Sequence, residues 1–330
     1  METMQRLSRR AFVCASGAAL VSLTTPALAA FPDHAVKWIV PFPAGGGMDT
    51  VTRLLAPKLS ESLGQNVIVD NKSGGSGFIG IMEMVNSRPD GHTLMMHAMG
   101  FVTNSAVYRS LPYDPAKDIQ PVAIIGSVPV VIAVGPKVEA NSLKELIDLA
   151  KKNPKRYKSA AFATGVSTLM LEMFRLQADI EMPIVPYRGV ADAVAATAGG
   201  ETDIVIMDGT SVVPHIKGGR LKGIAVAGPG RLAEIADIPT TAEAGLGSFK
   251  IEFWYAAFVR GGTPKPIVER LNADLNKAAT NAEVAEKLKA MALVPANRSA
   301  ASFEQQWFSE MRSWEDVLKK SGFKPIDLQQ

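Results

Sequence analysis

The sequence predicts an α/β fold, and three observations lead to this prediction. Short apolar runs alternate with amphipathic stretches along most of the chain, which is typical of parallel strands connected by helices. Several of these runs end in turns rich in glycine, serine or threonine that open the next amphipathic stretch. At 330 residues the chain is long enough for a large core, so we expect two domains.

Residues 1–29 have the pattern of a cleaved secretory signal. Three arginines precede an apolar stretch of small residues that ends near residue 25, and Ala27 and Ala29 fit the −3 and −1 positions of a cleavage site. The apolar stretch is too short to span a bilayer. We therefore expect a mature chain that begins at Ala30 and resides in the periplasm.

The same segment bears on the export route and on redox chemistry. Arg9 and Arg10 resemble the pair of a twin-arginine export signal, and an ordinary signal with two adjacent arginines fits equally well. The single cysteine, Cys14, lies in the part to be removed. The mature protein is therefore expected to have no disulfide bond and no thiol chemistry.

The charge balance argues against a nucleic-acid partner. Once the signal is removed, 32 lysines and arginines remain against 31 aspartates and glutamates. Such near-neutrality lacks the electrostatic footprint of a nucleic-acid binder. After residue 30, no apolar run reaches the length of a membrane span.

The first half of the chain opens with a strand at 36–41, because the sequence VKWIVP is almost wholly apolar. The glycine-rich loop that follows should lead to a helix that begins near Asp49 or Thr50 and ends near residue 62, with Asp49 as its N-cap. The same alternation predicts strands at 66–70 and 92–97, a helix at 78–86, and a long strand or strand pair at 122–126 and 129–134.

The second half repeats this rhythm. Residues 142–153 should form a helix, because their apolar residues recur on one face. Strands are expected at 159–163, 184–186, 204–207 and 221–227, with helices that begin near 167 and span 190–198. A strand at 254–259 should return to the first domain, and amphipathic helices at 264–280 and 302–319 should end the chain.

The turns rich in glycine, serine or threonine point to an anion. Three strand ends feed such turns, at residues 42–50, 71–78 and 163–168, and each turn opens a helix. Turns of this kind direct backbone N–H groups towards the carboxyl edge of a sheet, where the helix dipole favours negative charge. We therefore expect an anionic ligand at this edge.

Several segments carry a resemblance to a known family. They are residues 41–49 (PFPAGGGMD), 71–80 (NKSGGSGFIG), 89–94 (PDGHTL), 111–118 (LPYDPAKD), 185–189 (VPYRG), 214–221 (PHIKGGRL), Trp254 with Tyr255, and 262–264 (GTP). Together they resemble the substrate-binding receptors of tripartite tricarboxylate transporters, the Bug family, in the family's order and over nearly the whole mature chain.

The resemblance implies a two-lobed Venus-flytrap fold with two chain crossovers and the ligand in the cleft between the lobes. Lobe one is expected at residues 30–127 and 253–330, and lobe two at 128–252. The implied function is the capture of a small carboxylate (a di- or tricarboxylate, an amino acid or an aromatic acid) and its delivery to a membrane permease. We expect a monomer that needs no cofactor and catalyses no reaction.

The resemblance also implies that loops facing the cleft hold the ligand through backbone and hydroxyl groups. The residues expected there are Phe42, Ala44, Gly45, Gly46, Asp49, Ala163, Thr164, Ser167, Thr168, Tyr187, Arg188 and Asp208. Arg188 suits a carboxylate and could equally brace its own loop, while Asp49 and Asp208 are helix-cap candidates as well. The chain departs from the family at Thr168, where many members carry a histidine.

Other classes have weaker support. Gly75, Gly77 and Gly80 satisfy a dinucleotide-binding pattern, but it follows the second strand and lacks an acidic residue at the usual distance. A sensor for a signalling partner remains an alternative to transport. The four histidines show no helical pairing, and the methionines around His97 fit an apolar strand better than a copper site, so no metal site is expected.

Overall fold

The computed structural model describes residues 31–162, 166–187, 189–228, 230–321 and 324–328. The predicted signal segment and its cleavage site lie outside these ranges. The first part of the described chain alternates strands and helices as expected: β1 (Val36–Val40), α1 (Gly47–Leu63), β2 (Val67–Asn71), a 3-10 turn (Gly75–Gly77), α2 (Phe78–Val85), β3 (Thr93–Ala98) and α3 (Gly100–Val107).

A 16-residue strand, β4 (Ile119–Val134), leads out of this first unit. The chain then builds a second unit from α4 (Leu143–Lys152), β5 (Ser159–Phe162), α5 (Val166–Ala178), β6 (Ile184–Tyr187), α6 (Val190–Ala198), β7 (Ile204–Asp208), α7 (Gly209–Lys217), β8 (Lys222–Ala227) and a 3-10 turn (Ala233–Ile235). It returns through β9 (Glu252–Arg260) and ends with α8 (Lys265–Ala279), α9 (Ala282–Ala290), β10 (Val294–Pro295) and α10 (Ala300–Ser321).

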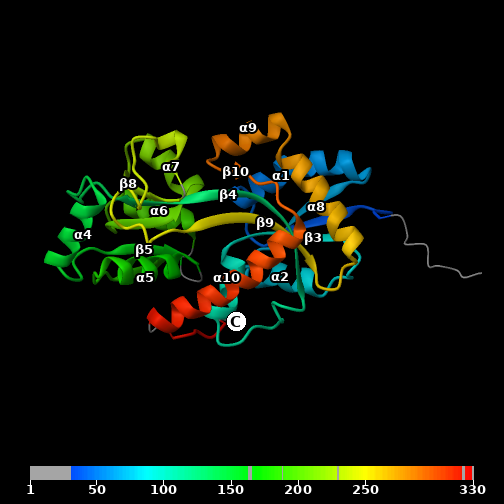
Figure 1. The fold of residues 1–330 in the computed structure, drawn as a ribbon, viewed down its shortest axis with the longest axis horizontal. Helices are drawn as coiled ribbons and strands as arrows, with labels where there is room; N and C mark the ends of the chain where they lie inside the picture. The colour runs from blue at the N-terminus through cyan, green and yellow to red at the C-terminus, as the bar shows by residue number, and fades with distance from the viewer. Residues whose placement is uncertain (1–30, 163–165, 188, 229, 322–323, 329–330) are drawn as a thin grey trace, which may run out of the picture.

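Two strands connect the lobes. The strand order is β2-β1-β3-β9-β4-β7-β5-β6, and β10 and β8 both pair with β4. The strand β4 pairs with β9 as far as Pro129, and from Val130 onwards it pairs with β7 and β8. Figure 1 shows β4 and β9 running between a lobe that contains α1, α8 and β3 and a lobe that contains α4 to α7. We call these lobe one and lobe two.

The sheet is mixed rather than wholly parallel. Within lobe one β1, β2 and β3 are parallel, and within lobe two β5, β6 and β7 are parallel. The two crossing strands are antiparallel to each other, and β9 is also antiparallel to β3. The reason is topological, since β4 carries the chain out of lobe one and β9 brings it back.

Helices cover both faces of each lobe. In lobe one α1, α8 and α9 lie on one face, and α2, α3 and α10 lie on the other (Figure 1). The face of α1 that contacts the sheet carries Val51, Leu55 and Leu59, all fully buried and spaced four residues apart. Burying each such side chain contributes roughly 1.5–3 kcal/mol, so this stripe fixes how α1 lies against the sheet.

The helices α3 and α9 were not predicted. α3 has no polar face because nearly all of its residues are buried, and the 3.6-residue periodicity that identifies a helix is therefore missing. In α9 only Val284 and Leu288 are buried, so this helix has no apolar stripe long enough to identify it. The predicted start of α1 was also wrong, because the helix begins at Gly47 with Gly46 as its N-cap, and Asp49 lies within the first turn.

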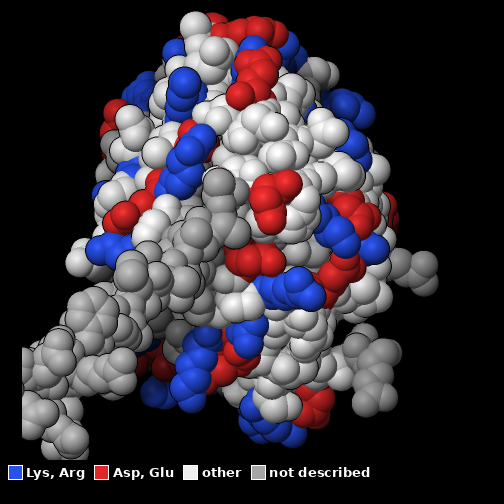
Figure 2. All heavy atoms as spheres, turned by 90° about the vertical axis from the view of Figure 1, so that its right-hand side faces the viewer, with Lys and Arg blue, Asp and Glu red and all other residues white. Residues whose placement is uncertain are grey.

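Across the described part of the chain, no helix combines the length and the apolar character that a membrane span requires. On the face of lobe one seen in Figure 2, lysine and arginine side chains are interspersed with aspartate and glutamate. That face presents no basic stripe that could follow a phosphate backbone.

Candidate functional site

The carboxyl edges of the parallel strands carry the helix starts. In lobe one, β1 and β3 lead to α1 and α3, and in lobe two, β5 and β7 lead to α5 and α7. The first backbone N–H groups of a helix have no partner inside that helix, and the helix dipole places partial positive charge there. Each lobe therefore presents helix N-termini at one edge of its sheet.

Helix starts from the two lobes meet. A Cβ atom placed on Gly47, at the start of α1, would lie 3.2 Å from the Tyr255 hydroxyl and 3.6 Å from Oγ1 of Thr210, at the start of α7. A Cβ placed on Gly100, at the start of α3, would lie 3.5 Å from Cγ1 of Val166, at the start of α5. We call the region around these five residues the lobe boundary.

On the side of lobe two, Asp208 caps α7. Its carboxylate accepts hydrogen bonds from the Ser211 N–H at 3.2 Å, from the Ser211 hydroxyl at 2.9 Å and from the Thr210 hydroxyl. This confirms the cap that the sequence suggested. The Tyr255 ring is buried, and burial together with the nearby Asp208 charge raises the pKa of its hydroxyl, while the hydrogen bond with Thr210 acts in the opposite direction. The hydroxyl is therefore protonated at neutral pH.

On the side of lobe one, the loop after β1 is fixed by Asp49. The Asp49 carboxylate is almost fully buried and accepts hydrogen bonds from the Gly45 N–H at 2.9 Å, from Nε of Arg53 at 3.0 Å and from Nδ2 of Asn71 at 3.0 Å. Nδ2 of Asn71 also donates to the Phe42 carbonyl at 3.1 Å. Burial opposes ionisation of Asp49, but these hydrogen bonds outweigh burial and lower its pKa.

The three glycines of this loop play different parts. Gly45 has φ 86°, a left-handed conformation that favours glycine, and its N–H is engaged with Asp49. Gly46 has φ −76°, and a Cβ there would meet nothing closer than the Pro43 carbonyl at 3.8 Å. Gly47 is the glycine that faces lobe two. Because the first bond of α1 runs from the Thr50 N–H to the Gly46 carbonyl, the preceding amides have no partner within the helix.

The remaining predicted residues are placed as follows. Phe42 is half-buried beside His97, and Ala44 is exposed. Ser167 is buried and Thr168 half-buried in the first turn of α5. The Tyr187 hydroxyl donates to Glu201 at 2.9 Å. Ala163, Thr164 and Arg188 lie outside the described residues.

His97 is a core residue next to the predicted site. Its ring lies between Phe42, at 5.5 Å, and Phe101, at 4.7 Å, and burial lowers its pKa to about 4. Nδ1 lies 2.9 Å from the Ala98 nitrogen and 3.2 Å from the Ala98 carbonyl oxygen, and with this pKa the ring is neutral at neutral pH. The adjacent Met95 and Met96 are fully buried, as expected for an apolar strand.

The glycines that resemble a dinucleotide fingerprint have a packing explanation. Gly77 has φ 95°, and a Cβ there would meet Phe42 and Pro41 at 3.5–3.6 Å. A Cβ on Gly80 would lie only 2.8 Å from Cβ of Pro41. These two glycines allow the start of α2 to pack closely against the loop after β1.

Sequence reasoning missed several residues of this region. Arg53 and Asn71 hold Asp49, and Gly47 and Thr210 form the contact between the lobes. The spacing of Asp49 and Arg53, four residues apart on a helix, could have suggested their ion pair. The contact of Gly47 with Thr210 had no signal in the sequence, because these residues are far apart in the chain.

The lobe boundary combines the helix starts of both lobes with the buried Asp49 and Asp208. Helix amides and hydroxyls provide donors, while Asp49 and Asp208 are occupied by internal hydrogen bonds. Two α/β lobes connected by two crossing strands, with donors where they meet, define a solute-binding protein of the periplasmic type.

Comparisons with known proteins agree with this class. Residues 51–323 match the model of the tripartite tricarboxylate transporter family receptor. The chain is 32% identical over 317 residues to the protein BugT of Bordetella pertussis, which covers 95% of this chain and 96% of that protein. The chain therefore belongs to the tripartite tricarboxylate transporter receptor family.

Solved structures give the same result. The structure of Rhodopseudomonas palustris Rpa4515 with adipate superposes with a TM-score of 0.82 at 31% identity, and covers 90% of this chain and 100% of that chain. MatC of the same organism, with bound malate, has a TM-score of 0.78 at 29% identity, and covers 87% of this chain and 100% of that chain. This chain is thus a solute-binding receptor with the two-lobed fold that the sequence predicted.

Proposed function

We propose that this receptor captures a small carboxylate in a cleft at the lobe boundary and delivers it, chemically unchanged, to the permease of a tripartite tricarboxylate transporter. The observation that carries the proposal is the meeting of the α1 and α7 starts at Gly47 and Thr210. Backbone amides at helix starts recognise carboxylates without a cationic side chain. Adipate and malate in the two related structures are carboxylates, which supports this ligand class.

The residues proposed to face the ligand are those named from the sequence, with Gly47, Thr210 and Tyr255 added from the structure. The lobes are proposed to divide at residues 127/128 and 252/253. The change of partners along β4 near Pro129 supports the first of these boundaries. We further propose that the protein is exported to the periplasm through cleavage before Ala30 and acts there as a monomer.

The test is a ligand screen on the receptor purified from the periplasm. Adipate, malate and other di- and tricarboxylates, amino acids and aromatic acids are added, and the melting temperature is recorded. A ligand at a hundred times its Kd stabilises the folded state by about 2.7 kcal/mol, so a binder gives a saturable increase in melting temperature. Calorimetric titration then gives the stoichiometry, which we expect to be one per chain.

Two results would contradict the proposal. If only neutral sugars raise the melting temperature, the carboxylate assignment is wrong. If the NMR spectrum of a bound ligand changes to that of a product during incubation, the protein catalyses a reaction. The control for substitutions at the lobe boundary is Gly247→Ala, because a Cβ at that exposed turn meets only Ala242, at 3.7 Å. This variant should bind as the parent does.

A further inference from the structure

A second group of polar side chains lies at the opposite edge of the lobe-one sheet. Asp33 and His34 precede β1, and Asp90 and His92 precede β3, which is its parallel neighbour. The Lys37 N–H donates to the His92 carbonyl at 2.8 Å, which holds the two strand starts side by side. The lobe boundary is at the carboxyl ends of the strands, so this group belongs to a separate part of the molecule.

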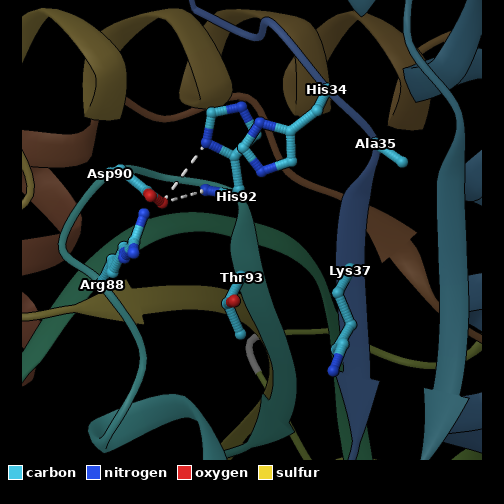
Figure 3. A pocket seen from close by; sticks show the side chains of 7 residues that line it. All are labelled: His34, Ala35, Lys37, Arg88, Asp90, His92 and Thr93. Atoms are coloured by element: carbon cyan, nitrogen blue, oxygen red, sulfur yellow. Dashed lines mark hydrogen bonds and ion pairs between the residues drawn. The ribbon is translucent and has the colours of Figure 1, made fainter.

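Three of these residues, His34, Asp90 and His92, line an open pocket of about 370 Å³. Figure 3 shows the two imidazole rings lying over each other, with Asp90 beside the ring of His92. The ring centroids of His34 and His92 are 3.7 Å apart, and the ring planes differ by 5°.

The distances suit a shared cation. Oδ1 of Asp33 lies 2.6 Å from Nδ1 of His34 and 3.1 Å from Nε2 of His92. One ligand atom from each of these three residues can be chosen so that all lie within 4.8 Å of one another. Around a tetrahedral zinc ion with bonds of 2.0–2.1 Å, ligand atoms are about 3.4 Å apart. Because imidazole lone pairs lie in the ring planes and the two rings are stacked in parallel, the exposed His34 ring must turn out of the stack for both histidines to share one ion.

The burial and hydrogen bonding of His92 are a second observation that favours a metal ligand. Its side chain is only 11% exposed, and neither ring nitrogen makes a hydrogen bond of normal geometry to the described residues. Oδ1 of Asp90 accepts the His92 N–H at 3.0 Å and lies 3.3 Å from Nδ1. A carboxylate behind one nitrogen of a histidine, with the other nitrogen facing a ligand, is the arrangement that supports histidines bound to metals.

The charges of the surrounding side chains are compatible with a bound cation. Asp33 and Asp90 contribute two negative charges, and Nζ of Lys37, the nearest lysine along the strand, is bound to Glu83 at 3.0 Å. Arg88 lines the same pocket and supplies one positive charge. Imidazole and carboxylate together suit zinc, nickel and copper(II) better than magnesium or calcium.

We propose that Asp33, His34 and His92 form a binding site for one divalent transition-metal ion of the zinc type, with Asp90 orienting His92. The ion would join the strand starts of β1 and β3 and so fix the first residues of the described chain to the sheet. The remaining coordination positions would be filled by water, because the pocket is open.

The experiment uses the receptor purified from the periplasm without a histidine tag and stripped of metal with EDTA. Zinc is titrated by calorimetry, and the melting temperature is measured with and without it. We expect one zinc per chain and an increase in melting temperature. His34→Ala and Asp33→Asn change exposed side chains and should leave folding intact, yet each should weaken zinc binding at least tenfold.

The controls separate this site from adventitious binding. His215→Gln, in α7 of lobe two, should bind zinc as the parent does, and magnesium should not compete. Absence of saturable zinc binding by the folded parent would overturn the proposal. So would zinc binding that is unchanged in a folded His34→Ala variant. The carboxylate site is tested by separate titrations, so either proposal can fail alone.

Discussion

Replacing Gly47 by alanine tests the contact between the lobes directly. The added Cβ would lie 3.2 Å from the Tyr255 hydroxyl, where ordinary van der Waals contact is 3.4–4 Å. The contact with Oγ1 of Thr210, at 3.6 Å, is an ordinary one, so it is the Tyr255 hydroxyl that must shift by a few tenths of an ångström. Because this hydroxyl is hydrogen-bonded to Thr210 of lobe two, the shift should disturb the contact between the lobes. Overpacking of this kind costs about 1–3 kcal/mol.

That cost should fall on ligand binding rather than on folding. Alanine is a better helix former than glycine by up to about 1 kcal/mol, so α1 itself should not be destabilised. If the ligand closes the lobes around this contact, 1–3 kcal/mol corresponds to a loss of affinity of about 5- to 150-fold. Calorimetric titration with adipate or malate, whichever binds, measures the change, and urea unfolding checks the fold. A folded Gly47→Ala variant with the parent's Kd would refute the reasoning.

Three further predictions follow from the buried charges and the N-terminus. Asp49→Asn should lower the free energy of unfolding at pH 7 by about 1.5–3 kcal/mol. Because the pKa of Asp49 is lowered in the folded protein, this stabilisation is lost as the pH falls below about 3.9. In urea titrations over this pH range, the free energy of unfolding of the variant should therefore change less with pH than that of the parent. The pKa of His97 is about 4 in the folded protein and about 6.5 in the unfolded chain, so the free energy of unfolding should fall as the pH is lowered from 6.5 to 4. In the same assay His97→Phe should be spared this decrease, which amounts to up to about 3 kcal/mol. Replacing Arg9 and Arg10 by lysine should block appearance in the periplasm, as measured by cell fractionation, whereas unchanged export would assign the signal to the general secretory route.

The sequence predicted most strands and the amphipathic helices because their signals are local. Runs of apolar residues and one-faced periodicity follow from burial against a single sheet, as in α1 and α8. The helix α3 was missed because it is buried on nearly all sides. Asp49 was misplaced as an N-cap because the true cap is Gly46, which has no side chain to reveal it.

The candidate site was predictable in its elements but not in its contacts. The glycine-rich turn after β1 and the Asp208 cap could be read from short stretches of sequence. The approach of Gly47 to Thr210 and that of His34 to His92 depend on how distant segments are folded together. No spacing rule connects residues separated by dozens of positions, and for this reason the histidines showed no pattern in the sequence.

The two aspartates at the lobe boundary also constrain how an anionic ligand can lie there. An aspartate without a counter-ion that lies about 7 Å from the carboxylate of the ligand would weaken binding by roughly 2 kcal/mol at an effective dielectric constant of 20. The charge of Asp49 is balanced by Arg53, whereas Asp208 has no ion-pair partner among the described residues and is held only by neutral donors. Burial raises the pKa of the Tyr255 hydroxyl, and the nearby charge of Asp208 adds to this increase. On the proposed function, the carboxylate of the ligand therefore lies towards the start of α1, and the part of the ligand nearest Asp208 is neutral or donates a hydrogen bond.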